Sequence, residues 1–183
     1  MSTYLFTSAR LGFREWKISD LAAMAEICAD KEVMEFFPST LSKDQTVEFI
    51  TTRQGKFTKN GFCYYAAEII ETNELIGFIG LSKQEYDAGF ETPFVDIGWR
   101  LKKSSWFKGY ATEGAKRSLE YGFKTLKLKT IYAITPSLNT KSTHVMDKIG
   151  MVKHTKFIHP SIADDCNLKE CLAYKITLEE WKD

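Results

Sequence analysis

The spacing of apolar and polar residues over the first third of the chain predicts one strand followed by two helices. Residues 10–16 alternate as in a strand with one buried face, and Ser19-Asp20 then offers an N-cap to a helix. Ser42 and Gln45 have the spacing of a capping box, and the helix they open is predicted to end at Asn60-Gly61.

The middle of the chain predicts three strands and a long helix. Residues 62–70 and 75–81 are strand-like runs joined by the polar hairpin loop 71–74, and residues 94–101 form a further strand after the polar loop 84–93. Small or apolar residues then recur at helical spacing up to residue 126, with charged residues between them. This stripe predicts a helix over 111–126.

The last third predicts a strand, a short helix and two closing strands. Residues 130–135 are rich in β-branched side chains and are followed by Pro136, after which Asn139 or Thr140 caps a helix that ends at Gly150. Residues 152–158 and 171–177 are the final strands, and the polar segment 160–169 separates them. The order β-α-α-β-β-β-α-β-α-β-β predicts a mixed α/β (α+β) fold with about seven strands and four helices.

Composition limits the domain count and the class of partner. The 183 residues, 44% of them hydrophobic, suffice for one core, so residues 1–183 are predicted to form a single domain. A net charge of +1 gives no overall field for nucleic acid or an anionic membrane. The most apolar run, residues 61–67, is far shorter than the roughly 20 residues that span a bilayer, which predicts a cytoplasmic protein.

The cysteines and histidines do not have the spacing of metal ligands. Cys166 and Cys171 are too far apart for a C-x2-C zinc hook, and we expect all four cysteines to be free thiols in a reducing compartment. Cys28 and Cys63 lie in apolar patterns that predict core positions. The three histidines are not grouped, so no metal is expected.

The segment 96–113 carries the chemical signal, because a strand ends there, a loop turns and a helix begins. The first backbone N–H groups of a helix have no intrahelical partner and favour anions, so such a junction can hold a pyrophosphate. Gly109 and Ala111 allow close approach, and Thr112 adds a hydroxyl. A lone G-x-A also occurs in ordinary strand-helix turns, but the chain has neither a G-x-x-x-x-G-K-[ST] phosphate loop nor a G-x-G-x-x-G.

Two motifs in this half of the chain resemble those of the GNAT acetyltransferases. Trp106 to Glu113 (WFKGYATE), preceded by Ile97-Gly98-Trp99, is similar to motif A of that family. Asn139-Thr-Lys-Ser142 and the run 145–151 are similar to its N-x-x-S helix. The branch most resembled is that of the ribosomal-protein N-terminal acetyltransferases. The resemblance implies a mostly antiparallel sheet that splays at a cleft for acetyl-coenzyme A.

The resemblance also implies which residues hold this co-substrate. The strand residues Trp99, Arg100 and Leu101 would pair with pantetheine through their backbone, Asn139 would hydrogen-bond it, and Ser142 would lie near the sulfur. The pyrophosphate would rest on the loop that follows Trp106, which comprises Phe107, Lys108, Gly109, Tyr110, Ala111 and Thr112. Lys102, Lys103 and Lys108 would attract the phosphates, with an ordinary solvated charged loop as the alternative for Lys102 and Lys103.

The implied reaction is acetyl transfer to a primary amine, which needs a proton acceptor for the amine and a donor for the thiolate. Many relatives have a tyrosine donor where this chain has Met146, so Ser142 is the substitute candidate, with helix capping as its alternative role. Asp96 is the candidate base, with an ion pair to a nearby Arg or Lys as the alternative. Glu113 is expected to complement the helix dipole.

One departure from the family leaves a second hypothesis open. Phe107 stands where the first glycine of the loop is usual, which is tolerated if its ring turns outward. Together with the missing tyrosine, this residue raises the alternative of a non-catalytic module that senses acyl-coenzyme A.

The acceptor is expected to be a small-molecule amine or a protein N-terminus. The first helices and the loops 84–93 and 160–169 are expected to bind it. Acidic residues in these loops favour a cationic acceptor, namely Glu85, Asp87, Glu91, Asp164 and Asp165. Relatives are commonly dimeric, so a homodimer is possible for this chain.

Overall fold

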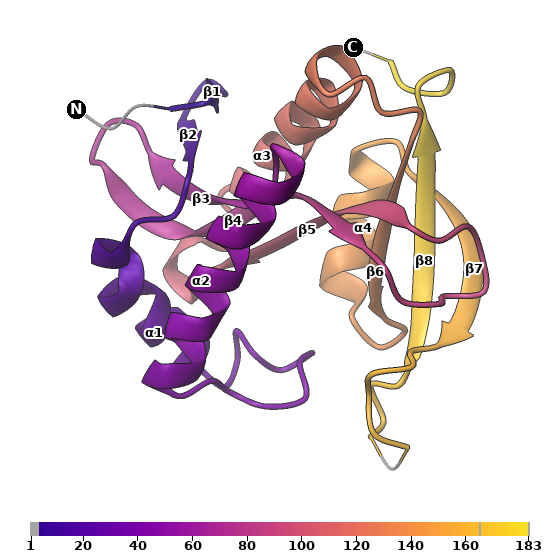
Figure 1. The fold of residues 1–183 in the computed structure, drawn as a ribbon, viewed down its shortest axis with the longest axis horizontal. Helices are drawn as coiled ribbons and strands as arrows, with labels where there is room; N and C mark the ends of the chain where they lie inside the picture. Colours follow the sequence, from indigo (N-terminus) through magenta and orange to yellow (C-terminus); the bar gives the residue numbers. More distant parts are fainter. Residues whose placement is uncertain (1–3, 165, 183) are drawn as a thin grey trace.

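A computed structural model describes residues 4–164 and 166–182, and its centre is one eight-stranded sheet in the order β1-β2-β3-β4-β5-β6-β8-β7 (Figure 1). Neighbouring strands are antiparallel except β5 and β6, which are parallel. The strands are β1 (Phe6–Thr7), β2 (Leu11–Arg14), β3 (Tyr64–Ile69), β4 (Glu74–Gln84), β5 (Phe94–Leu101), β6 (Thr130–Pro136), β7 (Val152–Ile158) and β8 (Glu170–Thr177). The mixed α/β class and the mostly antiparallel sheet are therefore confirmed.

Four α-helices cover the two faces of this sheet: α1 (Leu21–Ala29), α2 (Lys43–Asn60), α3 (Tyr110–Glu120) and α4 (Thr140–Lys148). Successive residues of β4 point to opposite faces. Phe78 packs against Phe49 of α2 with ring centroids 5.6 Å apart. Ile79 lies under Gly114 of α3, where an added Cβ would come within 2.4 Å of the Ile79 side chain. Helices α1 and α2 thus cover one face, and α3, with α4 beside it, covers the other.

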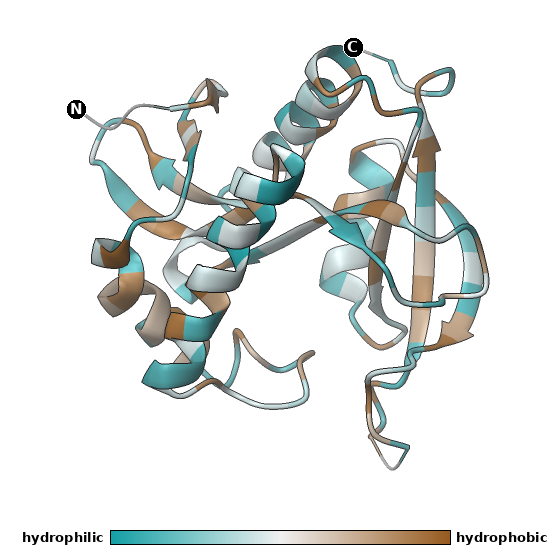
Figure 2. Cartoon of the chain, viewed as in Figure 1, coloured by the Kyte–Doolittle hydropathy of each residue, from teal (hydrophilic) through white to brown (hydrophobic). Residues whose placement is uncertain are grey.

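Local sequence signals position most of these helices. Ser42 and Gln45 form the predicted capping box at the start of α2, and Gly61 ends that helix with a left-handed φ of 78°. In Figure 2, α1 is largely brown, whereas α2 is mostly teal and white, as expected for a helix whose outer side meets solvent. Cys28 and Cys63 are buried free thiols, which confirms their predicted core positions.

The N-cap predicted at Ser19-Asp20 is correct in position, because Asp20 is the residue before α1, but the side-chain cap hydrogen bond that it implied is not formed. Asp20 belongs to a 3-10 turn, Ile18–Asp20, and makes no side-chain cap bond to α1. Its buried carboxylate instead accepts two hydrogen bonds from the Arg14 guanidinium, at 2.8 and 2.7 Å, and one from the backbone of Lys17. Arg14 also pairs with buried Glu68. A buried charge needs partners, and this requirement outweighs the capping preference.

Three further boundaries differ from the sequence predictions. The sheet has eight strands rather than seven, because Phe6 pairs with Phe13 in a two-residue strand too short to show a period. The helix predicted over 111–126 ends at Glu120 and continues as a π-helical turn, Tyr121–Thr125. The loop predicted over 84–93 begins one residue later, because β4 includes Gln84.

The described residues also bear on membrane insertion and metal binding. Across residues 4–164 and 166–182, no helix has both the length and the apolar character that crossing a membrane requires. Within the same ranges, no three His, Cys, Asp or Glu side chains gather in a group that could hold a metal ion.

Candidate functional site

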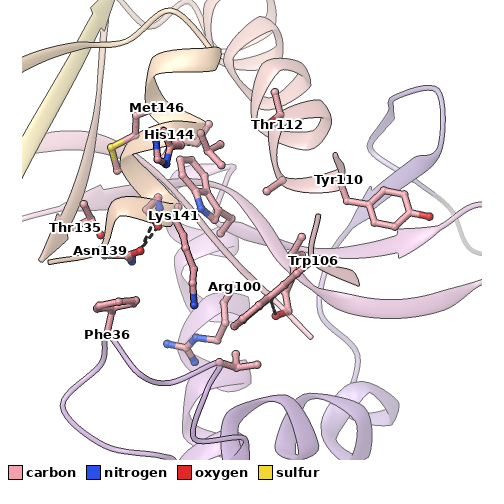
Figure 3. A pocket seen from close by; sticks show the side chains of 18 of the residues that line it. Phe36, Arg100, Trp106, Tyr110, Thr112, Thr135, Asn139, Lys141, His144 and Met146 are labelled. Carbon is pink, nitrogen blue, oxygen red and sulfur yellow. Dashed lines mark hydrogen bonds between the residues drawn. The ribbon is translucent and has the colours of Figure 1, made fainter. Parts of the chain in front are cut away.

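The candidate site is a cleft that opens where β5 and β6 separate. These parallel strands pair only at Asp96 and Tyr132. The edge of β5 that faces β6 is therefore unpaired from Ile97 to Leu101. The resulting cleft has a volume of about 680 Å³ and is lined by β5, the start of α3, α4 and the segment that follows α1 (Figure 3). The other edge of β6 pairs with antiparallel β8 along its whole length, and this pairing holds β6 in the sheet where it no longer pairs with β5.

The loop between β5 and α3 has the geometry of an anion site. The indole Nε1 of Trp106 donates to the carbonyl of Leu101 at 2.8 Å and so fixes the start of the loop. Gly109 is the residue before α3, with a left-handed φ of 81°, and no side chain caps the helix. The first N–H groups of α3 therefore have no partner within the helix, and the helix dipole makes this end attractive to a phosphate.

Phe107 is accommodated in this loop because its ring is exposed to solvent. Its φ is 58°, in the left-handed region that favours glycine, and its side chain is 92% exposed. A glycine at this position would adopt the same backbone conformation without strain. The ring thus meets the outward condition expected from the sequence, and the backbone of the loop is left clear.

Contacts with the β1–β2 turn hold the start of α3 in place. The Glu113 carboxylate accepts hydrogen bonds from the Ser8 hydroxyl at 2.7 Å and from the Arg10 backbone at 2.8 Å, and it forms an ion pair with the Arg10 side chain at 2.7 Å. Partial burial acts to raise the pKa of Glu113, but these hydrogen bonds outweigh it and lower the pKa. The Tyr110 ring points away from the cleft (Figure 3). The Cζ of the Arg10 guanidinium lies 4.5 Å from the centroid of this ring.

Helix α4 brings a small polar pair to the opposite wall. Asn139 is its N-cap and accepts a hydrogen bond from the Ser142 backbone N–H at 3.1 Å. The Asn139 amide also donates to the Ser142 hydroxyl at 3.0 Å. One turn farther along, Met146 is buried against the cleft and has no proton to donate. The sequence motif therefore forms a single hydrogen-bonded unit at the start of α4.

Asp96 is a buried acid at the point where β5 and β6 separate. Only 7% of its surface is exposed, and its carboxylate accepts hydrogen bonds from the Tyr64 hydroxyl at 2.7 Å and from Gln84 Nε2 at 2.9 Å. Burial raises the pKa of Asp96 to about 6, although these hydrogen bonds and the nearby charges of Lys56 and Arg53 act to lower it. Among the described residues it forms no ion pair, so the alternative role expected for it, pairing with Arg or Lys, is wrong.

Gly98 provides the space that Tyr64 needs to reach Asp96. Residues 96, 98 and 100 share one face of β5, and a Cβ added at Gly98 would lie 3.1 Å from the Tyr64 ring. The same ring stacks on Phe78 with centroids 5.0 Å apart. Burial and the Asp96 charge raise the pKa of Tyr64 well above its usual value. The tyrosine therefore stays protonated and donates to the acid.

The structure gathers nearly all the predicted site residues. The cleft is lined by Asp96, Trp99, Arg100, Leu101, Trp106, Phe107, Gly109, Tyr110, Ala111, Thr112, Asn139 and Ser142. Lys108 is the exception, because it is exposed and does not line the cleft. Lys102 and Lys103 form ion pairs with Glu74 and Glu32 instead of facing the loop.

The expectations for the acceptor side need correction. No residue of loop 84–93 and none of the described residues of segment 160–169 lines the cleft. Asp165 lies outside the described residues. Loop 84–93 instead packs Tyr86 and Phe90 against Phe94 and Tyr132. The described acidic residues of these segments therefore give no reason to expect a cationic acceptor.

Sequence reasoning missed several residues that line the cleft. Phe36 and Phe37 come from the segment after α1, Tyr64 from β3, and Lys141 and His144 from α4 (Figure 3). A Phe-Phe pair just before Pro38, outside any periodic pattern, was the available signal for the first two. Tyr64 had none, because it belongs to an ordinary strand pattern.

The chain matches known proteins over most of its length. A family model described as an acetyltransferase (GNAT) domain matches residues 10–152. The uncharacterized N-acetyltransferase YnaD of Bacillus subtilis (strain 168) is 30% identical over 176 residues, which cover 96% of this chain and 98% of YnaD.

Solved structures have the same fold. A GNAT-family acetyltransferase from Bacillus anthracis matches with a TM-score of 0.78 and 29% identity, over 95% of this chain and 98% of the other. RimJ of Mycobacterium smegmatis, solved in complex with CoA-disulfide, matches with a TM-score of 0.78 and 20% identity, over 94% of this chain and 84% of RimJ. At this lower identity the likeness concerns the fold.

Proposed function

This chain belongs to the GNAT family of acetyltransferases, and from that premise we propose that it moves an acetyl group from acetyl-coenzyme A to a primary amine by direct attack on the thioester. The observation that carries the proposal is Asp96, a buried carboxylate with a raised pKa at the point where β5 and β6 separate. The acceptor is a small amine or a protein N-terminus.

The residues of the cleft fit acetyl-coenzyme A. The uncapped start of α3 and the left-handed residues Phe107 and Gly109 would hold the pyrophosphate through backbone N–H groups. The unpaired edge of β5 from Trp99 to Leu101 would hold the pantetheine arm. When bound, acetyl-coenzyme A supplies an activated thioester carbonyl, so positioning of the amine contributes much of the rate.

Asp96 is proposed as the base that takes the proton of the acceptor ammonium, directly or through water. A carboxylate in water is a weak base near neutral pH, and burial makes Asp96 a better one by raising its pKa to about 6. Tyr64 and Gln84 orient the carboxylate through hydrogen bonds. The arrangement matches the general rule that catalytic acids and bases have perturbed pKa values.

Ser142 is proposed as the proton donor to the departing thiolate. Its hydroxyl oxygen accepts a hydrogen bond from Asn139, so the hydroxyl proton is available to a group in the cleft. The Asn139 side chain caps α4 by accepting a hydrogen bond from the backbone N–H of Ser142. The Ser142 hydroxyl is therefore not needed for capping.

The alternative function, a module that binds acyl-coenzyme A without turnover, loses one of its two motivations. The exposed ring of Phe107 does not obstruct the loop, so only the methionine at position 146 still favours it. The test is to measure acetyl-coenzyme A binding by calorimetry and thiol release with a panel of primary amines. Binding together with product supports the acetyltransferase, whereas binding with no product from any amine would favour the sensor.

A further inference from the structure

Arg100 is a buried cation whose side chain lies in the cleft on the face of the sheet covered by α1 and α2. Its exposed fraction is 8%, and its Nη1 donates only to the sulfur of Cys28, at 3.3 Å. Its Nε is buried and has no hydrogen-bond partner among the described residues. Figure 3 shows the guanidinium inside the cleft, between the Phe36 segment and Trp106, with Lys141 above it.

Aromatic rings surround this guanidinium on the protein side. Its Cζ lies 3.9 Å from the ring centroid of Phe37 and 5.5 Å from those of Phe49 and Phe78. Such contacts contribute modestly and do not replace hydrogen bonds to the N–H groups. Burial lowers the pKa of Arg100, and the contact with Cys28 opposes this only in part. The arginine is thus held in a desolvated, apolar pocket.

No carboxylate neutralises this charge within residues 4–164 and 166–182. Arg100 forms no ion pair there, and it interacts with a second cation, Arg53, whose pKa is lowered by burial and also by the Arg100 charge. The Nε of Arg53 is likewise buried without a described partner. Burying an unpaired charge is costly, and a purely structural position at this place would be better filled by an apolar side chain. The missing partner is therefore an anion that enters the cleft.

The position of Arg100 separates this anion from the pyrophosphate. The pyrophosphate loop leads into α3, which packs on the opposite face of the sheet from Cys28 and Phe49. Arg100 instead shares the face of Asp96, the proposed base. A group bound by Arg100 thus belongs to the acceptor.

We propose that Arg100 binds a carboxylate of the acceptor, so that the substrate is a primary amine with an apolar body that also carries a carboxylate, such as an amino acid or short peptide. This inference rests on the proposed acetyltransferase function. A guanidinium suits a carboxylate because its N–H groups form two parallel hydrogen bonds. Phe36, Phe37 and Phe78 would contact the apolar body.

The spacing along β5 sets the size of this acceptor. Asp96 and Arg100 are four residues apart in one strand, so their Cα atoms are roughly 13 Å apart. A polyamine, with several positive charges, would meet Arg100 and Lys141 in the cleft and be repelled by them.

The first experiment compares acids with their amides in the wild-type protein. L-phenylalanine, 5-aminovalerate and Gly-Phe are each assayed beside the corresponding amide, with spermidine as the polycation, and acetylated product is measured by mass spectrometry. At least one acid is expected to exceed its amide in kcat/KM by about tenfold or more, since hydrogen bonds to charged groups contribute that much. Equal or faster acetylation of the amides or spermidine overturns the inference but leaves the acetyltransferase standing. Absence of any product counts against the proposed function itself.

The second experiment changes the arginine. Arg100→Met is expected to raise KM for the preferred acid by about tenfold or more and to abolish the preference over its amide, while Arg100→Lys retains part of it. Arg117→Met, which removes a cation from the outer side of α3, is the matched control and should leave the preference unchanged. Calorimetric Kd values for coenzyme A should be equal in all variants, and a selective loss of coenzyme A binding in Arg100→Met would reassign Arg100 to the co-substrate.

Discussion

The Tyr64 hydroxyl lies 2.7 Å from each carboxylate oxygen of Asp96, although the two residues belong to strands that are not neighbours in the sheet. The ring crosses β4 on its way, stacked on Phe78 and above Gly98. This contact links the candidate base to the core and makes its protonation the most direct way to test the proposed chemistry.

The acidic limb of the pH profile should report Asp96. If Asp96 accepts the amine proton, kcat/KM rises with pH through an apparent pKa of about 6, because only the ionised carboxylate is a base. Asp96→Asn should lower kcat/KM by about a hundredfold and remove this limb. The measurement is steady-state thiol release from pH 5 to 9, with thermal melting at each pH as a control for folding. A limb that persists with the same midpoint in Asp96→Asn would exclude this role.

The same group should make stability depend on pH in the opposite sense. The folded pKa of about 6 exceeds the usual value of 3.8, so the native state binds more protons than the unfolded state between these values. The contribution of Asp96 to the free energy of unfolding is therefore fully present below about pH 4 and is lost as pH rises through 6, by roughly 2–3 kcal/mol. Urea unfolding of wild type and Asp96→Asn at pH 4, 5, 6 and 7 measures this difference. Parallel curves for the two proteins would contradict it.

Removing the Tyr64 hydroxyl should move the acidic limb upward. The hydrogen bond from Tyr64 stabilises the ionised form of Asp96, so Tyr64→Phe raises the pKa of Asp96 further. The midpoint of the kcat/KM profile is expected to shift to higher pH, with similar activity once Asp96 is ionised. Phe78→Leu, which alters the ring packing and keeps the hydroxyl, is the comparison. A downward shift in Tyr64→Phe would show that the phenol is not the donor.

Substitutions of Phe107 should follow the backbone conformation of the loop rather than the size of the side chain. Glycine adopts the φ of 58° without strain, so Phe107→Gly should bind acetyl-coenzyme A at least as tightly as wild type. Proline is locked near −65°, so Phe107→Pro should weaken binding by about tenfold or more. Calorimetry measures both Kd values, with Lys116→Ala on the exposed side of α3 as control. Equal binding by the glycine and proline variants would show that this loop does not hold the ligand.

Ser142 can be separated from the capping of α4 by removing only its hydroxyl. Ser142→Ala keeps the backbone N–H that Asn139 accepts, so the melting temperature should be nearly unchanged while kcat falls by about tenfold or more. Thr143→Ala removes a hydroxyl from the same helix outside the cleft and should keep wild-type kcat. Unchanged turnover in Ser142→Ala would remove Ser142 from the mechanism and leave water as the proton donor.

Features encoded within a few residues could be predicted from the sequence. The capping box of Ser42 and Gln45, the end of α2 at Gly61, and the cap of α4 at Asn139 each depend on side chains reaching nearby backbone. The motif 106–113 predicted the loop before α3 for the same reason, because the groups proposed to bind phosphate are the backbone amides of that segment. The two-residue β1 escaped detection because it is shorter than one period of any pattern.

The direction and environment of individual side chains were decided by the tertiary structure. Lys108 lies in the motif yet does not line the cleft, and Asp20, expected to cap a helix with its side chain, is buried in an ion pair with Arg14. The raised pKa of Asp96 depends on burial by residues far away in the chain, and the unpaired charge of Arg100 on contacts with α1 and α2. The sequence by itself thus determined the family, the elements and the loop, because these follow from local pattern. Only the packing of distant segments decided which groups are desolvated and left without partners, and those are the groups proposed to act on the acceptor.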